Sequence, residues 1–274
     1  MKNCDRMPGG TFEILLQTGT CVQQAVMTHD LHLASFQKGD HICFVYRDTE
    51  EQLSTAAPFV QVGLARGERC LCVLPKAGLD GLFSWLDDHG VDTQKELARG
   101  ALLAATPEEA YLKGNGFDRH QMVKLLDDAM RESLRLGFSG FRGTGDLSWA
   151  VSDANACGQL AEYEAMLDRY YPGTKQLGIC MYDANLFDSA QLNRLIDAHR
   201  LALAVPSPTK RAIRIRNGKA FGEVIFDRQL AQVFHYTVQK NGTKELFNLG
   251  QESTLTAAID AVEASLRALS RARA

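Results

Sequence analysis

Five short apolar segments, separated by longer segments with helical spacing, constrain this chain to an α/β fold. The apolar segments are HICFVY (41–46), RCLCVL (69–74), GALLAA (100–105), GFSGFR (137–142) and LGICMY (177–182). Each is bounded by Gly, Pro or polar residues and is apolar almost throughout, which is typical of strands buried on both faces. The pattern predicts a mainly parallel sheet flanked by helices.

The segments between these runs have the spacing of amphipathic helices. Apolar side chains recur every three or four residues in residues 50–67. Residues 118–137 repeat the pattern, with Asp118 placed to cap the start of a helix and Gly137 placed to end it. Residues 152–171 form a third predicted helix.

The pattern changes after Pro206 and Pro208, which disfavour helix. Asn-Gly pairs at 217–218 and 241–242 each lie between β-like runs, and this is the strongest short-range hairpin signal because both central residues of a type I′ turn need a positive φ. Residues 255–269 then carry a single apolar stripe with helical spacing. We predict an N-terminal extension (1–38), an α/β domain (39–205) and a small C-terminal module (209–274) made of an antiparallel β-meander with one helix.

The sequence favours a cytoplasmic protein without a membrane span. No apolar run approaches the roughly 20 residues that cross a bilayer, and MKNCDRMPGG lacks an apolar signal core. The seven cysteines are odd in number, scattered, and never arranged as CxxC. They therefore indicate reduced thiols rather than a disulfide framework.

Charge is distributed unevenly along the chain. Residues 205–274 contain 11 Lys or Arg and 6 Asp or Glu. The rest of the chain contains 19 Lys or Arg and 27 Asp or Glu. The basic C-terminal strands could contact DNA, as β-sheets do in some regulators. The alternative is a solvated strand face on which charge prevents aggregation.

Nucleotide-binding motifs are absent from the sequence. The segment after the first strand, Tyr46-Arg47-Asp48-Thr49-Glu50, has no glycine and two acids, so it cannot cradle phosphates as a P-loop does. No GxGxxG motif follows a strand. These observations disfavour ATP hydrolysis and dinucleotide binding, and we predict that the chain is not an enzyme.

Polar and aromatic residues gather where two predicted strands end, which is where parallel α/β sheets bind ligands. Arg142, Asp146 and Trp149 surround a Gly-rich bend in GFSGFRGTGDLSWA, and Tyr182 and Asp183 follow the fifth run. These residues could line a pocket, with the aromatic rings supplying apolar surface and the charged groups orienting a ligand. A structural glycine loop, a packed Trp and a helix-capping Asp remain an equal alternative.

Two further candidates lie in or near helices. Glu164, in the run Glu162-Tyr163-Glu164, could face the sheet edge, although a helical glutamate is more often solvated. His199, in DAHRLAL, is interpreted as a histidine at a helix end rather than a ligand.

His41 and Cys43 stand two residues apart on the first predicted strand, so both side chains should point to the same face. A metal site would need three or four ligands, and the additional thiols available are Cys72 and Cys180 on other strands. A nucleophilic role fits poorly because reactive cysteines lie at helix N-termini or in electropositive clefts. A structural or ligand-gating role is favoured over direct ligation, and we expect no stoichiometric metal.

Six phrases in a fixed order resemble the MEDS family, sensory domains named for methanogens, methylotrophs and the dichloromethane-responsive regulator. They are G-D-H-I-C-F-V-Y, P-F-V-x-x-G-L-x-x-G-E-R-C, Y-L-x-G-x-G-F-D, G-x-x-G-F-R-x-x-G-D-L-S-W, E-Y-E-A and I-C-M-Y-D, spread over about residues 36–205. The resemblance implies a RecA/KaiC-like fold that lacks the phosphate-binding loop. It also implies sensing of small hydrocarbon derivatives, with the signal passed to an attached kinase or DNA-binding module.

Residue by residue, the resemblance places the family's His-x-Cys motif on His41 and Cys43. Its acidic and aromatic strand-end positions fall on Asp146, Trp149, Tyr182 and Asp183. The sequence departs from the family's usual arrangement because it shows neither a histidine-kinase module nor an obvious helix-turn-helix, so the C-terminal module is the candidate for output.

The leading hypothesis is a cytosolic sensor, acting in signal transduction or transcription regulation, that binds a small organic ligand. The predicted ligand-binding residues are His41, Cys43, Tyr46, Arg142, Asp146, Trp149, Glu164, Tyr182 and Asp183; the cofactor is unknown. Residues 209–274 could contact DNA or a regulatory protein, and the C-terminal helix could pair in a homodimer. The alternatives are a DNA-binding regulator and a metal-binding protein that uses His41, Cys43 and Cys180.

Overall fold

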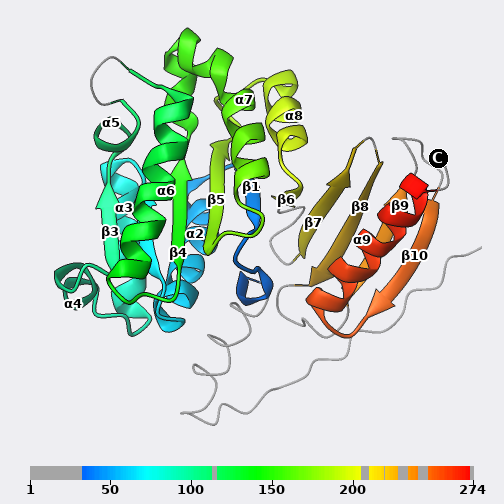
Figure 1. Ribbon diagram of the computed structural model, residues 1–274, viewed down its shortest axis with the longest axis horizontal. Helices are drawn as coiled ribbons and strands as arrows, with labels where there is room; N and C mark the ends of the chain where they lie inside the picture. The colour runs from blue at the N-terminus through cyan, green and yellow to red at the C-terminus, as the bar shows by residue number, and fades with distance from the viewer. Residues whose placement is uncertain are drawn as a thin grey trace, which may run out of the picture.

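Strands and helices alternate along the computed structural model, which describes residues 33–112, 116–204, 210–218, 220–227, 234–239 and 246–271 (Figure 1). The strands are β1 (His41–Tyr46), β2 (Arg69–Val73), β3 (Leu102–Ala105), β4 (Phe141–Asp146), β5 (Gln176–Asp183), β6 (Leu201–Ala204), β7 (Lys210–Asn217), β8 (Ala220–Asp227), β9 (Phe234–Gln239) and β10 (Leu246–Glu252). The helices are α2 (Thr49–Ala65), α3 (Lys76–Asp88), α4 (Thr93–Ala98), α5 (Pro107–Ala110), α6 (Arg119–Arg135), α7 (Ala154–Tyr170), α8 (Ser189–Ala198) and α9 (Leu255–Arg271), with 3-10 turns η1 (Leu33–Ser35) and η2 (Ser148–Ser152).

The described strands form one sheet in the order β10-β9-β8-β7-β6-β1-β5-β4-β2-β3. The six strands from β6 to β3 pair in parallel, whereas β7 to β10 continue the sheet in antiparallel pairs. The predicted fold class, a mainly parallel sheet with a C-terminal antiparallel series, is confirmed. None of the described helices is both long and apolar enough to cross a membrane.

Helices cover both faces of the parallel strands (Figure 1). Ile42 and Phe44 of β1 belong to a core shared with α2 and α3. Cys43, which points the other way, belongs to a second core shared with α6, α7 and α8. Burial on both faces is the reason that the strands read as continuous apolar runs.

Several predicted boundaries are confirmed, but the fourth strand is displaced. β1 coincides with the predicted run, and the Asp118 carboxylate caps α6 by accepting from the backbone N–H groups of residues 120 and 121. The strand predicted at 137–142 instead spans Phe141–Asp146, because Gly137, with a φ of 88°, belongs to the turn after α6. The glycines read as a bend therefore lie inside β4. β6 has only four residues, too few for its pattern to be recognised as a strand.

The C-terminal strands follow the hairpin predictions where they are described. β7 and β8 pair around Asn217-Gly218, with Gly218 at a φ of 61°, and β9 pairs with β10. The second Asn-Gly pair, at 241–242, lies outside the described residues, as does most of the predicted N-terminal extension. Because β7 pairs with β6, the meander continues the main sheet. The division into separate domains stays a prediction.

The apolar stripe of α9 is buried within its own chain. Val262 and Leu266 pack with residues of β7, β8 and β9 in a common core. This side of the helix is therefore covered and is not available to pair across a two-fold axis. A homodimer formed through another surface stays a prediction.

Leu266→Ala tests this packing. Leu266 is 1 % exposed, so its truncation should lower the free energy of unfolding by about 2–5 kcal/mol, measured by urea denaturation. The neighbouring Arg267 is largely exposed, and Arg267→Ala should cost less than about 0.5 kcal/mol. Equal effects of the two variants would contradict the packing.

Candidate functional site

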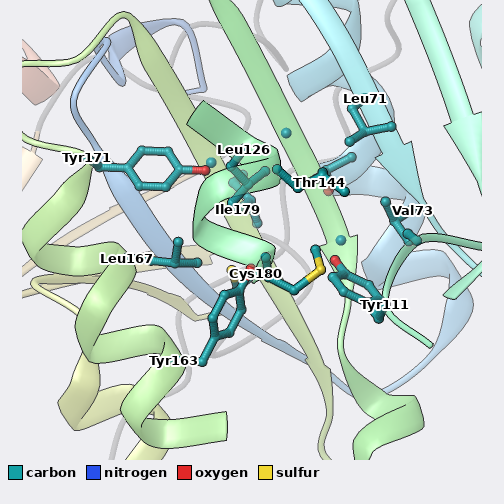
Figure 2. Close-up of a pocket in the computed structure, with 16 residues that line it drawn as sticks. Leu71, Val73, Tyr111, Leu126, Thr144, Tyr163, Leu167, Tyr171, Ile179 and Cys180 are labelled. Carbon is teal, nitrogen blue, oxygen red and sulfur yellow. The ribbon is translucent and has the colours of Figure 1, made fainter. Parts of the chain in front are cut away.

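A small cavity lies on the sheet face that α6 and α7 cover. Its volume is about 50 Å³, and it lies against β2, β4 and β5 (Figure 2). Apolar side chains form most of its wall, among them Val73, Leu126 and Leu167. Three tyrosines, Tyr111, Tyr163 and Tyr171, and the Cys180 thiol complete the wall.

Three glycines of β4 and β5 leave room for this cavity. A Cβ on Gly178 would lie 2.5 Å from the Tyr171 hydroxyl, and one on Gly145 would overlap the Tyr111 hydroxyl. At Gly143 a Cβ would meet nothing closer than 3.8 Å. The tyrosines therefore occupy the space of two missing side chains, whereas the space at Gly143 remains open.

The cavity combines an apolar wall with neutral hydrogen-bond donors. Burial raises the pKa of Tyr111, Tyr163 and Tyr171 well above the usual range, so the phenols stay protonated. No hydrogen bond from these hydroxyls to another described residue occupies them. An apolar site with a few convergent polar groups is the usual form of a small-molecule pocket.

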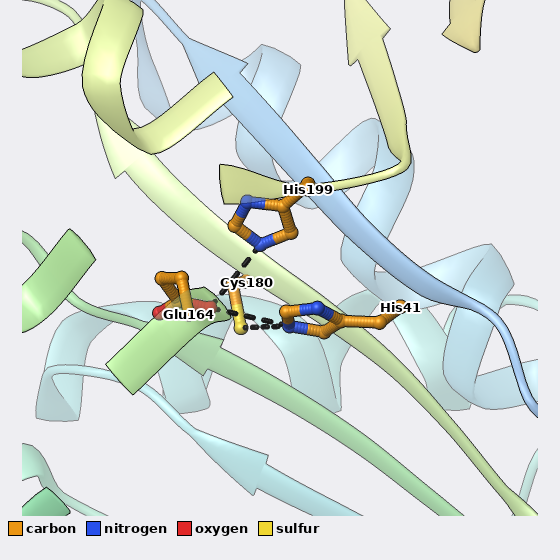
Figure 3. Close-up of side chains that lie close together, drawn as sticks. All are labelled: His41, Glu164, Cys180 and His199. Atoms are coloured by element: carbon orange, nitrogen blue, oxygen red, sulfur yellow. Dashed lines mark hydrogen bonds and ion pairs between the residues drawn. The ribbon is translucent and has the colours of Figure 1, made fainter. Parts of the chain in front are cut away.

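Beside the cavity, four side chains converge from β1, α7, β5 and the end of α8 (Figure 3). Glu164 Oε2 lies 3.2 Å from both His41 Nε2 and His199 Nε2, and His41 Nε2 lies 3.3 Å from Cys180 Sγ. The donor atoms of all four residues are within 4.8 Å of one another. Cys180 is partly exposed and also lines the cavity, so it belongs to both sites.

The two imidazoles are fixed from their outer sides. His199 Nδ1 lies 2.7 Å from the Leu195 carbonyl oxygen, and His41 Nδ1 lies 3.6 Å from the Asp168 carboxylate. The rings stack with centroids 4.2 Å apart, and Tyr171 stacks on the other face of His41 at 5.0 Å. This leaves the Nε2 atoms of both rings facing Glu164.

Glu164 has no solvent exposure, so its charge must be balanced locally. Burial opposes its ionisation, but His199 and His41 outweigh burial and lower the pKa of the carboxyl. Burial also favours a neutral His41, yet the carboxylates of Asp168 and Glu164 raise its pKa. Burial and the charge of His41 lower the pKa of His199. The Glu164 carboxyl group thus lies between two buried imidazoles whose pKa values are shifted in opposite directions.

Several predicted site residues hold the carboxyl ends of the strands together. The Asp146 carboxylate accepts hydrogen bonds from Tyr46 Oη (2.7 Å), Gln52 Nε2 (2.8 Å) and the Ser148 backbone N–H (2.8 Å). Asp183 accepts from the Asn185 backbone N–H at 2.8 Å. These internal contacts stabilise the strand ends, and a role of Tyr46, Asp146 or Asp183 in ligand binding stays a prediction.

Arg142 lies away from these strand ends. It belongs to the start of β4 and points toward α2, where Nε donates to Glu68 Oε2 at 2.6 Å and the guanidinium lies 4.5 Å from the Phe59 ring centroid. Placing it beside Asp146 and Trp149 was therefore wrong, because the strand begins four residues later than predicted. Arg142 and Glu68 form a buried ion pair on the opposite face of the sheet.

The remaining predicted residues border the cavity or the cluster. Trp149 stacks on Tyr111 with centroids 5.3 Å apart, and Tyr182 meets His199 edge-on at 6.3 Å. Cys43 shares a face with His41, as predicted, and is paired in register with Cys180. Cys72 belongs to the core on the α2 side, away from this face.

Sequence reasoning undervalued two members of the cluster. Glu164 occupies the same helical stripe as Leu160, Tyr163 and Leu167, all buried, and a carboxylate inside such a stripe is a signal of burial. His199 follows α8, and no comparable pattern in the sequence indicated that its side chain is buried. The cavity tyrosines Tyr111 and Tyr171 were also missed.

The basic C-terminal strands offer less free charge than their composition indicates. Arg211 is buried, and Arg214 Nη2 pairs with Glu223 Oε1 on the neighbouring strand at 2.9 Å. DNA contact through this module stays a prediction.

The model of one family, "MEthanogen/methylotroph, DcmR Sensory domain", matches residues 40–200. The chain belongs to the MEDS family. The cavity and the cluster both lie in the matched region, and the resemblance seen in the sequence is confirmed. No curated protein matches the chain.

Solved structures similar to this MEDS protein come from the archaeon Pyrococcus horikoshii. An uncharacterized protein in complex with an unknown peptide has a TM-score of 0.49 and 15% identity, covering 76% of this chain and 94% of that chain. A KaiC-like protein has a TM-score of 0.40 and 12% identity, covering 79% and 85%.

Arg142→Met tests the structural role of the buried ion pair. It leaves Glu68 buried with only Lys38, 3.7 Å away, as a partner, so it should lower the free energy of unfolding by about 3–5 kcal/mol. Arg142→Met combined with Glu68→Leu removes both charges and should recover most of this loss in the same denaturant titration. A single variant as stable as the parent chain would contradict the role.

Proposed function

We propose that this MEDS domain senses a small, weakly polar organic molecule that binds in the cavity between the sheet and helices α6 and α7. The observation that carries the proposal is the cavity itself, an apolar space edged by three phenols and a thiol in a member of a sensory family. Its position differs from the strand-end pocket expected from the sequence, because it lies on the face of the sheet.

The size of the cavity restricts the ligand. A volume of about 50 Å³ is far below the roughly 150 Å³ of an engineered cavity that binds benzene. Compounds with one or two carbon atoms fit this space, and aromatic compounds do not. This range agrees with the simple hydrocarbon derivatives that the family resemblance implies.

The side chains that line the cavity favour a weakly polar ligand. The phenol hydroxyls can donate hydrogen bonds to a halogen or oxygen atom, whereas the apolar side chains and the buried Glu164 nearby disfavour an anion. A compound with an apolar body and one acceptor atom satisfies both requirements.

Helix α7 connects the ligand to the rest of the domain. Tyr163 and Leu167 on this helix line the cavity, Glu164 between them holds the histidine cluster, and Tyr171 caps the helix end. A ligand that contacts α7 differently in two positions of the helix would shift the population between them. Transcription regulation through an attached or separate partner would follow from that shift.

Gly143→Ala is the direct test of this proposal. Its methyl group, about the size of one water molecule, would fill roughly half of the cavity without a clash. Binding of dichloromethane or methanol should weaken by at least about tenfold, or 1.4 kcal/mol. Trp149 fluorescence in a Trp85→Phe background can report binding, since Trp149 stacks on Tyr111 and the chain has 2 tryptophans.

Gly158→Ala, on the exposed face of α7 where a Cβ meets nothing, is the matched control and should bind like the parent chain. Benzene should not bind either protein. The absence of saturable binding by any one- or two-carbon compound, or equal affinities in the two alanine variants, would refute the proposal.

A further inference from the structure

We propose that His41, Glu164, Cys180 and His199 form a binding site for a single zinc ion. This site goes beyond the sensing cavity, from which it is separate except at Cys180. It also replaces the expectation from the sequence that the protein holds no stoichiometric metal. That expectation rested on a ligand set made of His41 and thiols of the sheet, without Glu164 and His199.

Three of the distances between donor atoms are close to those of tetrahedral coordination. Atoms bound to zinc at about 2.0–2.3 Å in a tetrahedron lie roughly 3.3–3.7 Å from one another. The two Nε2–Oε2 distances are 3.2 Å and the Nε2–Sγ distance is 3.3 Å. All four donor atoms lie within 4.8 Å of one another, so shifts of up to about 1 Å in the remaining pairs would be enough to accept the ion.

Both histidines are oriented as zinc ligands usually are. A ligating imidazole donates its outer N–H to a carbonyl or carboxylate, which fixes the tautomer and leaves the other nitrogen as an electron-pair donor. The Leu195 carbonyl oxygen occupies this position for His199 at 2.7 Å, and the Asp168 carboxylate lies 3.6 Å from His41 Nδ1, just beyond hydrogen-bond distance. The free Nε2 of each ring then faces the interior of the cluster.

Polar atoms inside the cluster lack hydrogen-bond partners among the described residues. They are both carboxylate oxygens of Glu164 and Nε2 of His199. His199 Nε2 lies 3.2 Å from Glu164 Oε2, and its Nδ1 is engaged by the Leu195 carbonyl oxygen. A cation bound between Nε2 and Oε2 would give both atoms a partner.

The charges and the chemistry of the donors favour Zn²⁺. A glutamate and a cysteine thiolate neutralise its two positive charges, and two neutral imidazoles complete the set, so the buried site has no net charge. Mixed nitrogen, sulfur and oxygen ligands suit zinc, whereas Mg²⁺ and Ca²⁺ select oxygen alone. Cys180 also lines the cavity, so the site adjoins that space.

The first experiment is elemental analysis of the full chain, produced without a histidine tag and dialysed against buffer free of chelators. The result expected is about one zinc per chain, lost in Cys180→Ser and in His199→Gln. Cys157→Ser and His89→Gln, which change a partly exposed cysteine and a histidine outside the cluster, should keep the metal. Gly143→Ala should also keep it, which separates this site from the sensing cavity.

Replacement of zinc by Co²⁺ provides a readout that loss of folding cannot imitate. The parent chain should show a thiolate-to-cobalt charge-transfer band, and Cys180→Ser, checked by circular dichroism for an intact fold, should lack it. Asp168→Asn should retain the band but bind zinc about 10–100-fold more weakly. A folded parent chain that contains no zinc and takes up neither zinc nor Co²⁺ would overturn the proposal, as would an unchanged band in Cys180→Ser.

Discussion

The absence of side chains at three positions of β4 and β5 is the constraint on which the cavity depends. Gly143, Gly145 and Gly178 face α6 and α7, and their missing Cβ atoms leave space in a sheet that is otherwise tightly packed. Tyr111 and Tyr171 extend into two of these positions, so their hydroxyls reach a layer that is normally apolar. Because interiors are packed to crystal-like density, a cavity with polar edges at this place is a specific feature of the fold.

The same face carries a fully buried carboxylate. Glu164 is fully buried and depends on His41 and His199 for compensation. Cys180 lies between the cavity and this cluster, and α7 supplies side chains to both. The cavity and the cluster are therefore joined by one strand and one helix.

The parts of the fold that depend on local pattern were predictable from the sequence. The limits of β1, the Asp118 cap and the Asn217-Gly218 hairpin follow from apolar runs, side-chain capping and positive φ. The start of β4 was not predictable in this way, because glycines usually indicate a bend, and here they are accommodated by tyrosines distant in sequence. That displacement also placed Arg142 at the wrong end of the strand.

The site was only partly predictable for a related reason. His41 and Cys43 share a face by strand periodicity, and Glu164 lies in an apolar helical stripe, but their meeting with Cys180 and His199 depends on the strand order β6-β1-β5. Strand order is a tertiary property that no local window contains. The expectation of a pocket beyond the strand ends came from a general rule for α/β sheets, whereas the cavity depends on three particular glycines.

The position of the cavity is the central claim, and a crystal of the full chain under xenon pressure tests it most directly. Xenon enters apolar cavities that are large enough to hold it. We predict an anomalous peak on the α6–α7 face, in contact with Gly143 and Leu167. Xenon bound only beyond the strand ends near Asp146 and Trp149, with none on this face, would contradict the account.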